Sequence, residues 1–230
     1  DLGCVLSATA ERLKLIDGRG SLLDEHQTTA VVGSMLLATG PAEIVLPVAT
    51  PQWVLDTLSG GGAGPTLARN DPGSVLRQAV VGRATLAADG AGGLAWPGHL
   101  GAYDAMYALV RLLELRARLG RPLAELRSAL RVTPHLTTTA FCPWELKGRV
   151  LRVLVEEHGG AELDLVDGVK IAVAGGYVLV VPDRDTPSYQ VAVSHQDAAE
   201  AARLLEEYRL RVQAVGGASA DEAPGGGASI

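Results

Sequence analysis

The hydrophobic and polar positions in the middle of this chain alternate between two patterns. The segment EIVLPVA at residues 43–49, which is apolar after its glutamate, is typical of a buried strand, and apolar residues then recur every three or four positions, as on one face of a helix. Short apolar runs and helical periods continue to alternate up to about residue 132. Strands that alternate with helices predict a three-layer α/β domain with a mainly parallel sheet.

The pattern changes in the last third of the chain. A helix through Glu157 is followed by short apolar runs separated by Asp167-Gly168 and Gly175-Gly176, which are strong signals for two-residue hairpins. A final amphipathic helix is expected from about Asp197 to Val212. A helix, antiparallel strands and a second helix predict a small α+β domain with one sheet face covered.

The first residues predict only part of a domain. Residues 3–6 and 13–16 are short strands, the turn after the second strand contains Asp17-Gly18, and Asp24 is suited to cap the helix that follows. So few strands cannot bury both faces of a sheet. We therefore expect further sequence upstream of Asp1.

Two helices of the middle region have specific signals. Thr50-Pro51 is suited to begin a helix, with threonine as its N-cap and proline at its first position. A longer helix is expected from Tyr103 to Leu119. We expect its apolar side to consist of Met106, Leu109, Val110, Leu113 and Leu115.

These patterns divide the chain into four regions. Residues 1–39 are expected to form a partial α/β domain, residues 40–132 a complete α/β domain and residues 133–216 the α+β domain. Residues 217–230 contain little to bury and are expected to be disordered.

Composition excludes several classes of function. The formal net charge is -6 and charged residues make up 20% of the chain, so nucleic acid is not an expected partner. No apolar stretch reaches the roughly 20 residues that a membrane span requires. Cys4 and Cys142 lie far apart and outside any metal-binding spacing, which indicates reduced cysteines in a cytoplasmic protein.

Five segments resemble the phosphomannomutase/phosphoglucomutase (α-D-phosphohexomutase) superfamily. They are LGCVLSATAERLKLIDGRG, PAEIVLPVAT, AADGAGGLAWPGHLGAYDAMYALVRLLEL, CPWELKGRVLRVLVEE and LVDGVKIAVAGGYVLVVPDRDTPSYQVAVSH. Their order is similar to the end of domain II, domain III and domain IV of that family. The resemblance implies a TATA-box-binding-protein-like fold for residues 133–216. PWELKGRV and DGVKI are most similar to mutase-like regions fused to mannose-1-phosphate guanylyltransferase-type nucleotidyltransferases.

The segment that resembles the family's metal loop departs from the family pattern. That pattern has three aspartates at alternating positions followed by an arginine, because a magnesium ion is held by several carboxylate oxygens. The matching residues here are Ser7, Thr9, Glu11 and Arg12. Only one carboxylate remains, so we expect no metal at these positions. Taken without the resemblance, the segment is a hairpin loop.

The segments that resemble the sugar-binding and phosphate-binding loops also depart from the pattern. Asp89 and Gly92 match the glutamate and the last glycine of the sugar loop, and the resemblance implies a contact with sugar hydroxyls; a simple Asp-Gly turn is the alternative. In the phosphate loop, Val181 replaces the arginine and Asp183 replaces the serine. Arg184 either offers a weak phosphate contact or pairs with a neighbouring aspartate.

The family's catalytic phosphoserine belongs to a domain that this sequence does not contain, so no catalytic residue is expected here. The five histidines show no metal-ligand spacing: His26, His99, His135, His158 and His195. We expect a catalytically degenerate region, a pseudoenzyme with a structural, oligomerising or regulatory role in sugar-phosphate metabolism. The expected partners are N-terminal domains of the same polypeptide, a sugar phosphate and a second copy of the chain.

Two alternatives remain open. One is the C-terminal half of an active phosphomannomutase/phosphoglucomutase, an isomerase that would use magnesium. The other is a binding module that senses a sugar phosphate as an effector. If the chain is not part of an active mutase, no cofactor is expected.

Overall fold

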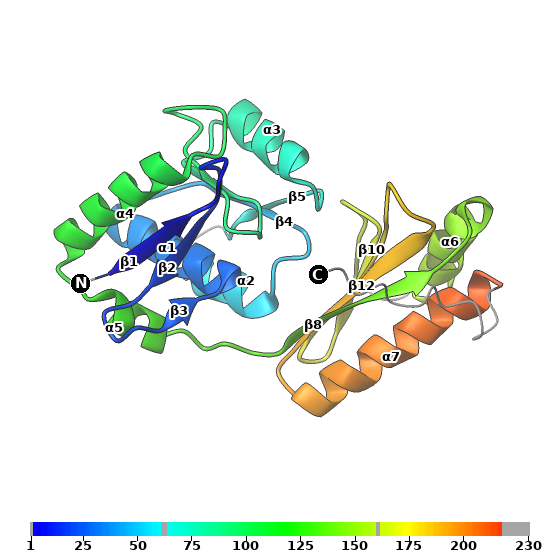
Figure 1. The fold of residues 1–230 in the computed structure, drawn as a ribbon. Coiled ribbons are helices and arrows are strands. Elements are labelled where there is room, and N and C mark those ends of the chain that lie inside the picture. The colour runs from blue at the N-terminus through cyan, green and yellow to red at the C-terminus, as the bar shows by residue number, and fades with distance from the viewer. Residues whose placement is uncertain (1, 61–63, 160–161, 218–230) are drawn as a thin grey trace. The chain divides into compact units, whose positions relative to one another are not determined.

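The computed structural model describes residues 2–60, 64–159 and 162–217, which form two compact units, Asp1–Val132 and Thr133–Ile230. Apart from residue 217, the tail that the sequence predicts to be disordered lies outside the described residues. The assignment of residues 1–39, 40–132 and 133–216 to three family domains stays a prediction. Figure 1 shows the course of each unit.

The first unit begins with a small antiparallel sheet in the order β1-β2-β3. Its strands are β1 (Gly3–Leu6), β2 (Leu13–Ile16) and β3 (Leu22–Leu23). Leu15 lies opposite Leu23 in the register and both are buried. Helix α1 (Glu25–Thr39) follows, and Asp24 caps it by accepting a hydrogen bond from the Gln27 amide at 2.7 Å. Both strands and the cap are as the sequence predicted.

Asp17 holds the turn between β2 and β3. Its carboxylate, with 1% of the side chain exposed, accepts hydrogen bonds from the Arg19 and Ser21 amides at 2.9 and 3.0 Å and pairs with Arg127 at 3.3 Å. The Ser21 amide is the largest cause that lowers the pKa of Asp17 below its ordinary value, followed by the Arg19 amide and Arg127.

This lowered pKa predicts a loss of stability in acid. A carboxyl group with a lowered folded-state pKa stabilises the protein above its unfolded pKa, and this contribution disappears as the pH falls through the folded pKa. We expect Asp17→Asn to unfold at lower urea concentration than the parent at pH 6, with a difference that shrinks below about pH 4. Urea unfolding from pH 2 to pH 6 measures this. A difference that stays constant to pH 2 would contradict it.

The larger sheet of the first unit has the order β5-β4-β6-β7. Its strands are β4 (Ile44–Pro47), β5 (Thr66–Ala68), β6 (Leu86–Ala88) and β7 (Leu94–Ala95). β4 is parallel to β5 and β6, and β7 is antiparallel to β6. Alternate residues of the strands enter two hydrophobic clusters, with Ile44 and Leu46 in one and Val45 in the other. The sheet is thus covered on both faces, as expected of a three-layer α/β fold.

Helices cover the two faces of this sheet. α3 (Pro72–Gly82) contributes Val75 and Ala79 to one cluster, and the other contains residues of α1, α2 (Gln52–Leu58), α4 (Ala105–Leu119) and α5 (Leu123–Ser128). The N-cap of α2 is Pro51. The predicted N-cap role of Thr50 is wrong, because its hydroxyl donates to the Pro47 carbonyl at 2.7 Å.

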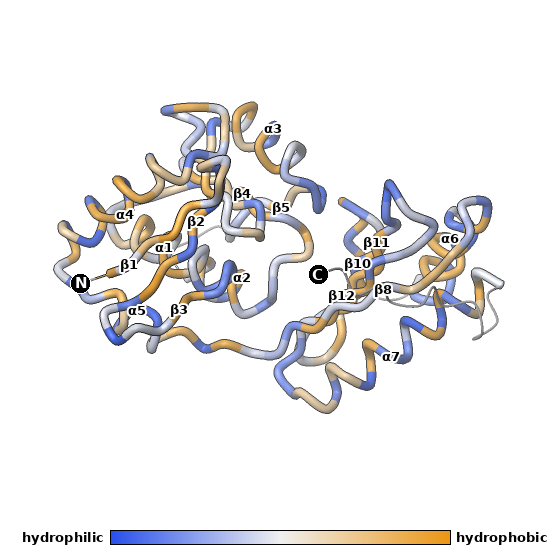
Figure 2. The backbone as a smooth tube through the Cα atoms, viewed as in Figure 1, coloured by the Kyte–Doolittle hydropathy of each residue, from blue (hydrophilic) through white to orange (hydrophobic). Residues whose placement is uncertain are grey.

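The predicted apolar side of α4 is also largely wrong. Met106, Val110 and Leu113 are 60%, 60% and 45% exposed, whereas Ala105, Ala108, Leu112 and Leu115 are buried. Apolar residues occur around much of this helix, as its hydropathy colouring shows (Figure 2), so periodicity alone could not select the buried face. The small side chains of Ala105 and Ala108 allow this face to approach the core closely.

The second unit is a five-stranded antiparallel sheet in the order β8-β12-β11-β10-β9. Its strands are β8 (His135–Phe141), β9 (Leu163–Asp164), β10 (Val169–Val173), β11 (Gly176–Pro182) and β12 (Ser188–His195). α6 (Lys147–Glu157), preceded by the 3-10 helix η1 (Trp144–Leu146), and α7 (Ala198–Val215) share one hydrophobic cluster with this sheet. The sequence analysis missed β8.

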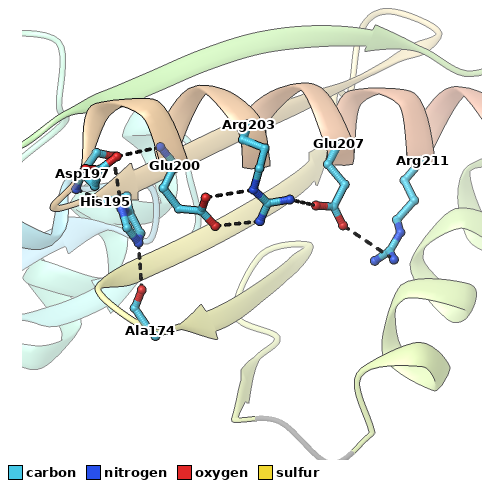
Figure 3. Close-up of polar contacts among 7 residues, drawn as sticks. All are labelled: Ala174, His195, Asp197, Glu200, Arg203, Glu207 and Arg211. Atoms are coloured by element: carbon cyan, nitrogen blue, oxygen red, sulfur yellow. Dashed lines mark hydrogen bonds and ion pairs between the residues drawn. The ribbon is translucent and has the colours of Figure 1, made fainter.

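The β10–β11 hairpin turn is fixed by His195. Val173 pairs with Gly176, so the turn residues are Ala174 and Gly175 rather than the predicted Gly175-Gly176. The buried His195 ring interacts through Nε2 with the Ala174 carbonyl at 2.8 Å, and its Nδ1 accepts from the Asp197 amide at 3.0 Å (Figure 3). His195 therefore connects the hairpin turn to the start of α7 and has a structural role.

The outer side of α7 carries a row of ion pairs. Arg203 pairs with Glu200 at 2.6 Å and with Glu207 at 2.8 Å, and Arg211 pairs with Glu207 at 3.7 Å (Figure 3). These charges at intervals of three and four residues neutralise one another on a solvent-exposed helix face.

Candidate functional site

The loop between β1 and β2 contains Ser7, Thr9, Glu11 and Arg12, which the sequence resemblance assigned to the family's metal loop. Its hydroxyl and carboxylate groups contact one another: Ser7 Oγ lies 3.3 Å from Thr9 Oγ1, which donates to Glu11 Oε2 at 3.3 Å. The Arg12 amide donates to Ser7 Oγ at 3.2 Å. Each group that matches a metal ligand therefore already has a partner within the loop.

The same loop is attached to the beginning of α4. Ala10 adopts a left-handed backbone conformation with φ of 54°, and its carbonyl accepts a hydrogen bond from the Ala105 amide at 2.8 Å. Ala105 is the first residue of α4, which Asp104 caps. This contact fixes the loop against the segment that resembles the sugar-binding loop and its helix.

Asp89 lies between β6 and β7, and its side chain is only 2% exposed. Oδ1 accepts hydrogen bonds from the Ala91 and Gly93 amides at 2.7 and 2.8 Å, and Oδ2 accepts from Arg12 Nε at 3.3 Å. The structure therefore brings together Arg12 and Asp89, two residues that the sequence analysis singled out separately. Their side chains contact each other, and the Asp89 carboxylate also closes its own loop.

Gly92 permits a close approach between the two loops. Its carbonyl accepts from the Leu13 amide at 3.1 Å, and its φ is 92°. A Cβ atom at this position would lie 3.0 Å from the Leu13 carbonyl oxygen. Gly92 is thus required by backbone packing, a role that a turn signal in the sequence does not reveal.

Tyr103 also belongs to this site and was missed by the sequence analysis. Its hydroxyl donates to the Pro72 carbonyl at 2.9 Å. Burial is the largest cause that raises the pKa of Tyr103 above its ordinary value, and the negative charges of Asp89 and Asp71 raise it further. Tyr103 therefore remains a neutral hydrogen-bond donor. No sequence motif marks it.

A cavity of about 310 Å³ adjoins the Arg12 side of the site. Its lining is largely aliphatic: Val5, Leu6, Ser7, Arg12, Leu13, Lys14 and Ala91. Arg12, with a half-exposed side chain, is one of two cations in this lining. The cavity thus offers little hydrogen-bonding capacity for a sugar.

In the second unit, the loop between β11 and β12 belongs to the segment that the sequence resemblance assigned to the family's phosphate loop. Asp183 Oδ1 accepts hydrogen bonds from the Asp185 and Thr186 amides, both at 2.8 Å. Both hydrogen bonds lower the pKa of Asp183 below its ordinary value, and the bond from the Asp185 amide is the larger cause. A carboxylate therefore occupies two backbone donors of the kind that bind anions in such loops.

Lys147, which the sequence analysis did not select, stabilises the same loop from α6. Its ammonium group donates to the carbonyls of Asp183 and Thr186 and lies 3.7 Å from the centre of the Trp144 ring. Thr186 and Ser188 place their hydroxyl oxygens 2.7 Å apart. The only sequence feature that included Lys147 was the PWELKGRV segment. It was noted for its resemblance to the family and not for this lysine. Val181 is buried in β11, and Arg184 is exposed in the loop that follows.

Other candidate chemistry is weak. Within residues 2–60, 64–159 and 162–217, no group of three or more His, Cys, Asp or Glu side chains could hold a metal ion. Cys4 and Cys142 are free thiols, and burial raises the pKa of both. None of the helices that the structure describes has the length and apolarity needed to cross a membrane.

The fold is that of phosphohexomutase domains. A phosphoglucomutase/phosphomannomutase family protein from Burkholderia thailandensis superposes with a TM-score of 0.77 at 21% identity, over 94% of this chain and 47% of that protein. The Aspergillus fumigatus N-acetylphosphoglucosamine mutase, solved with GlcNAc-6P and magnesium, gives a TM-score of 0.63 at 13% identity, over 94% and 49%. The chain therefore has a phosphohexomutase fold.

Sequence comparison indicates the same class. The chain is 26% identical over 205 residues to a probable phosphoglucosamine mutase of Methanococcoides burtonii, covering 87% of this chain and 45% of that protein. It is 24% identical over 208 residues to a phosphoglucomutase/phosphomannomutase of Thermococcus kodakarensis, covering 90% and 46%. No family model matches. The chain is a phosphohexomutase-like region that spans about half the length of these curated relatives.

Proposed function

We propose that this chain is a catalytically degenerate phosphohexomutase-like region with a structural or regulatory role in sugar-phosphate and nucleotide-sugar metabolism. The observation that carries this proposal is that its three ligand-like loops are closed by their own side chains. Glu11 accepts from Thr9, Asp89 accepts from Arg12 and two loop amides, and Asp183 accepts from two further amides. A ligand would have to displace these contacts before it could bind.

The donor set of the Ser7–Arg12 loop fits magnesium poorly. Magnesium requires hard, preferably anionic oxygen ligands and gives up its water reluctantly. Here Glu11 is the only carboxylate, and the hydroxyls of Ser7 and Thr9 bring no charge to offset dehydration of the ion. The proposal therefore includes no cofactor.

Magnesium titration tests this part of the proposal. We expect no saturable binding up to millimolar magnesium in calorimetry of the 230-residue chain, and the same result for Glu11→Ala. Saturable heat that Glu11→Ala abolishes would contradict the prediction and restore the loop as a metal site.

A second candidate function is the C-terminal half of an active phosphoglucosamine, phosphogluco- or phosphomannomutase. It is favoured by the names of the curated relatives and by Arg12, which matches the family's metal-loop arginine. In that case the remaining domains would supply the phosphoserine, and a sugar phosphate would be the substrate. Tight binding of glucose 1-phosphate by the chain would favour this candidate.

The wider context is part of the same proposal. N-terminal domains of the same polypeptide are the proposed partners, because the chain spans about half the length of its relatives. Fusion to a sugar-1-phosphate nucleotidyltransferase rests on PWELKGRV and DGVKI alone. A cytoplasmic location agrees with two free cysteines.

A further inference from the structure

The outward face of α4 carries an apolar stripe that is exposed among the residues that the structure describes. Met106, Val110 and Leu113 are 60%, 60% and 45% exposed, and Ala117 is also exposed. These four positions are separated by four, three and four residues, which is the spacing of the seam in a two-helix coiled coil. The helix also buries the opposite face in the core of its own unit. A second helix could therefore pack on the stripe without any rearrangement of the core.

We propose that this stripe is the contact between two copies of the chain, whose α4 helices pack antiparallel about a two-fold axis. The axis passes between Arg111 and Leu112, the midpoint of the stripe. In this register Met106 lies opposite Ala117 of the second copy. A long side chain thus faces a short one, as complementary packing requires.

The charges on α4 fit this arrangement. Glu114 pairs with Arg111 and with Arg118 in the same helix, so these groups need no partner from the second copy. In the antiparallel register Glu114 faces Leu109 and Arg116 faces Tyr107, so like charges are not opposed. The last turn, with its two arginines, meets the first turn and the Asp104 cap of the other copy, and opposite helix dipoles align favourably.

The stripe also has the composition of a small interface. Its centre is aliphatic, and the charged residues lie along its edges, which matches the apolar core and polar rim of protein contacts. A parallel arrangement of the helices would instead bring the arginines of the two last turns together. The antiparallel register is therefore the favoured one.

Sedimentation equilibrium of the 230-residue chain tests the proposal. We expect a concentration-dependent dimer. Val110→Glu should raise its dissociation constant by about a hundredfold, because each buried carboxylate raises the constant by at least about tenfold and the symmetric contact contains two of them. The matched control is Val81→Glu, at an 80% exposed valine on α3 outside the stripe. It should leave the dimer unchanged. Circular dichroism of both variants checks that they remain folded.

Cross-linking tests the register directly. Val110 of one copy lies opposite Leu113 of the other, so a mixture of Val110→Cys and Leu113→Cys chains should form a mixed disulfide faster than either variant forms its own. A chain that remains monomeric at 100 μM would overturn the proposal and leave the stripe to be covered by another part of the polypeptide. A dimer that Val110→Glu does not weaken would overturn it as well. Neither readout depends on sugar-phosphate binding.

Discussion

Asp183→Ser is expected to let the second unit bind glucose 1-phosphate or mannose 1-phosphate at least about tenfold more tightly than the parent chain. In the parent, the Asp183 carboxylate accepts from the Asp185 and Thr186 amides, so these donors are occupied by an internal anion. Removing the carboxylate frees two donors and removes a charge that repels phosphate. A charge-assisted hydrogen bond contributes roughly 1.5 to 3 kcal/mol, which supports the expected factor.

The matched control for this variant is Asp185→Ser. It removes the same charge from the same loop but leaves the Asp183 carboxylate on its two amides. If occupation of the amides is the cause, Asp183→Ser should exceed Asp185→Ser in affinity at every salt concentration. Equal gains from both variants would instead indicate general charge repulsion, which salt would screen.

The double substitution Val181→Arg with Asp183→Ser introduces the residue types of the family pattern. Because Val181 is buried in β11, circular dichroism first checks that this variant is folded; the folded variant should bind more tightly still, most clearly at low salt. Calorimetric titration of the parent, both single aspartate variants and the double variant measures the series. Tight binding by the parent that none of these changes alters would contradict the closed-loop interpretation and favour the active-mutase candidate.

Gly168→Ala is expected to destabilise the second unit by roughly 3 kcal/mol or more. Gly168 has φ of 69°, and a Cβ atom there would lie 2.1 Å from the Val180 carbonyl oxygen. Because that neighbour is backbone within the β10–β11 pair, it cannot move aside like the end of a flexible side chain. The left-handed conformation adds a further cost of about 1 kcal/mol or more for a residue with a Cβ atom.

Gly148→Ala is the matched control in the same unit. A Cβ atom at this position in α6 meets no heavy atom within 4 Å, and alanine is a better helix former by roughly 0.8 to 1 kcal/mol. We expect this variant to be unchanged or slightly more stable. Urea unfolding followed by circular dichroism and by tryptophan fluorescence measures both. Equal stability of the two variants would show that the backbone near Gly168 can rearrange.

Local signals in the sequence predicted most secondary-structure elements. The ends of β1 and β2 follow from short apolar runs, and the cap at Asp24 follows from a carboxylate placed before a helical period. β8 was missed because its run of three threonines carries little hydrophobic pattern. Its strand conformation depends on pairing with β12, a contact between distant segments.

The candidate site was predicted in part. Sequence comparison with the family pattern selected Arg12, Asp89 and Asp183, but it treated each as a residue of a separate loop. It could not predict that Arg12 and Asp89 bind each other, because 77 residues separate them. Nor could it select Lys147, whose role depends on carbonyl groups contributed by the β11–β12 loop.

By itself, the sequence determined the class of fold, and its resemblance to the phosphohexomutase pattern predicted a metal-loop segment with Glu11 as its one carboxylate. These properties depend on residue type and on neighbours within a few positions. Only the tertiary structure decided which side of α4 is buried and that the Asp89 carboxylate binds Arg12. Both depend on how distant segments pack, because a helix with apolar residues around much of its surface has several faces that it could bury, and 77 residues separate Arg12 from Asp89.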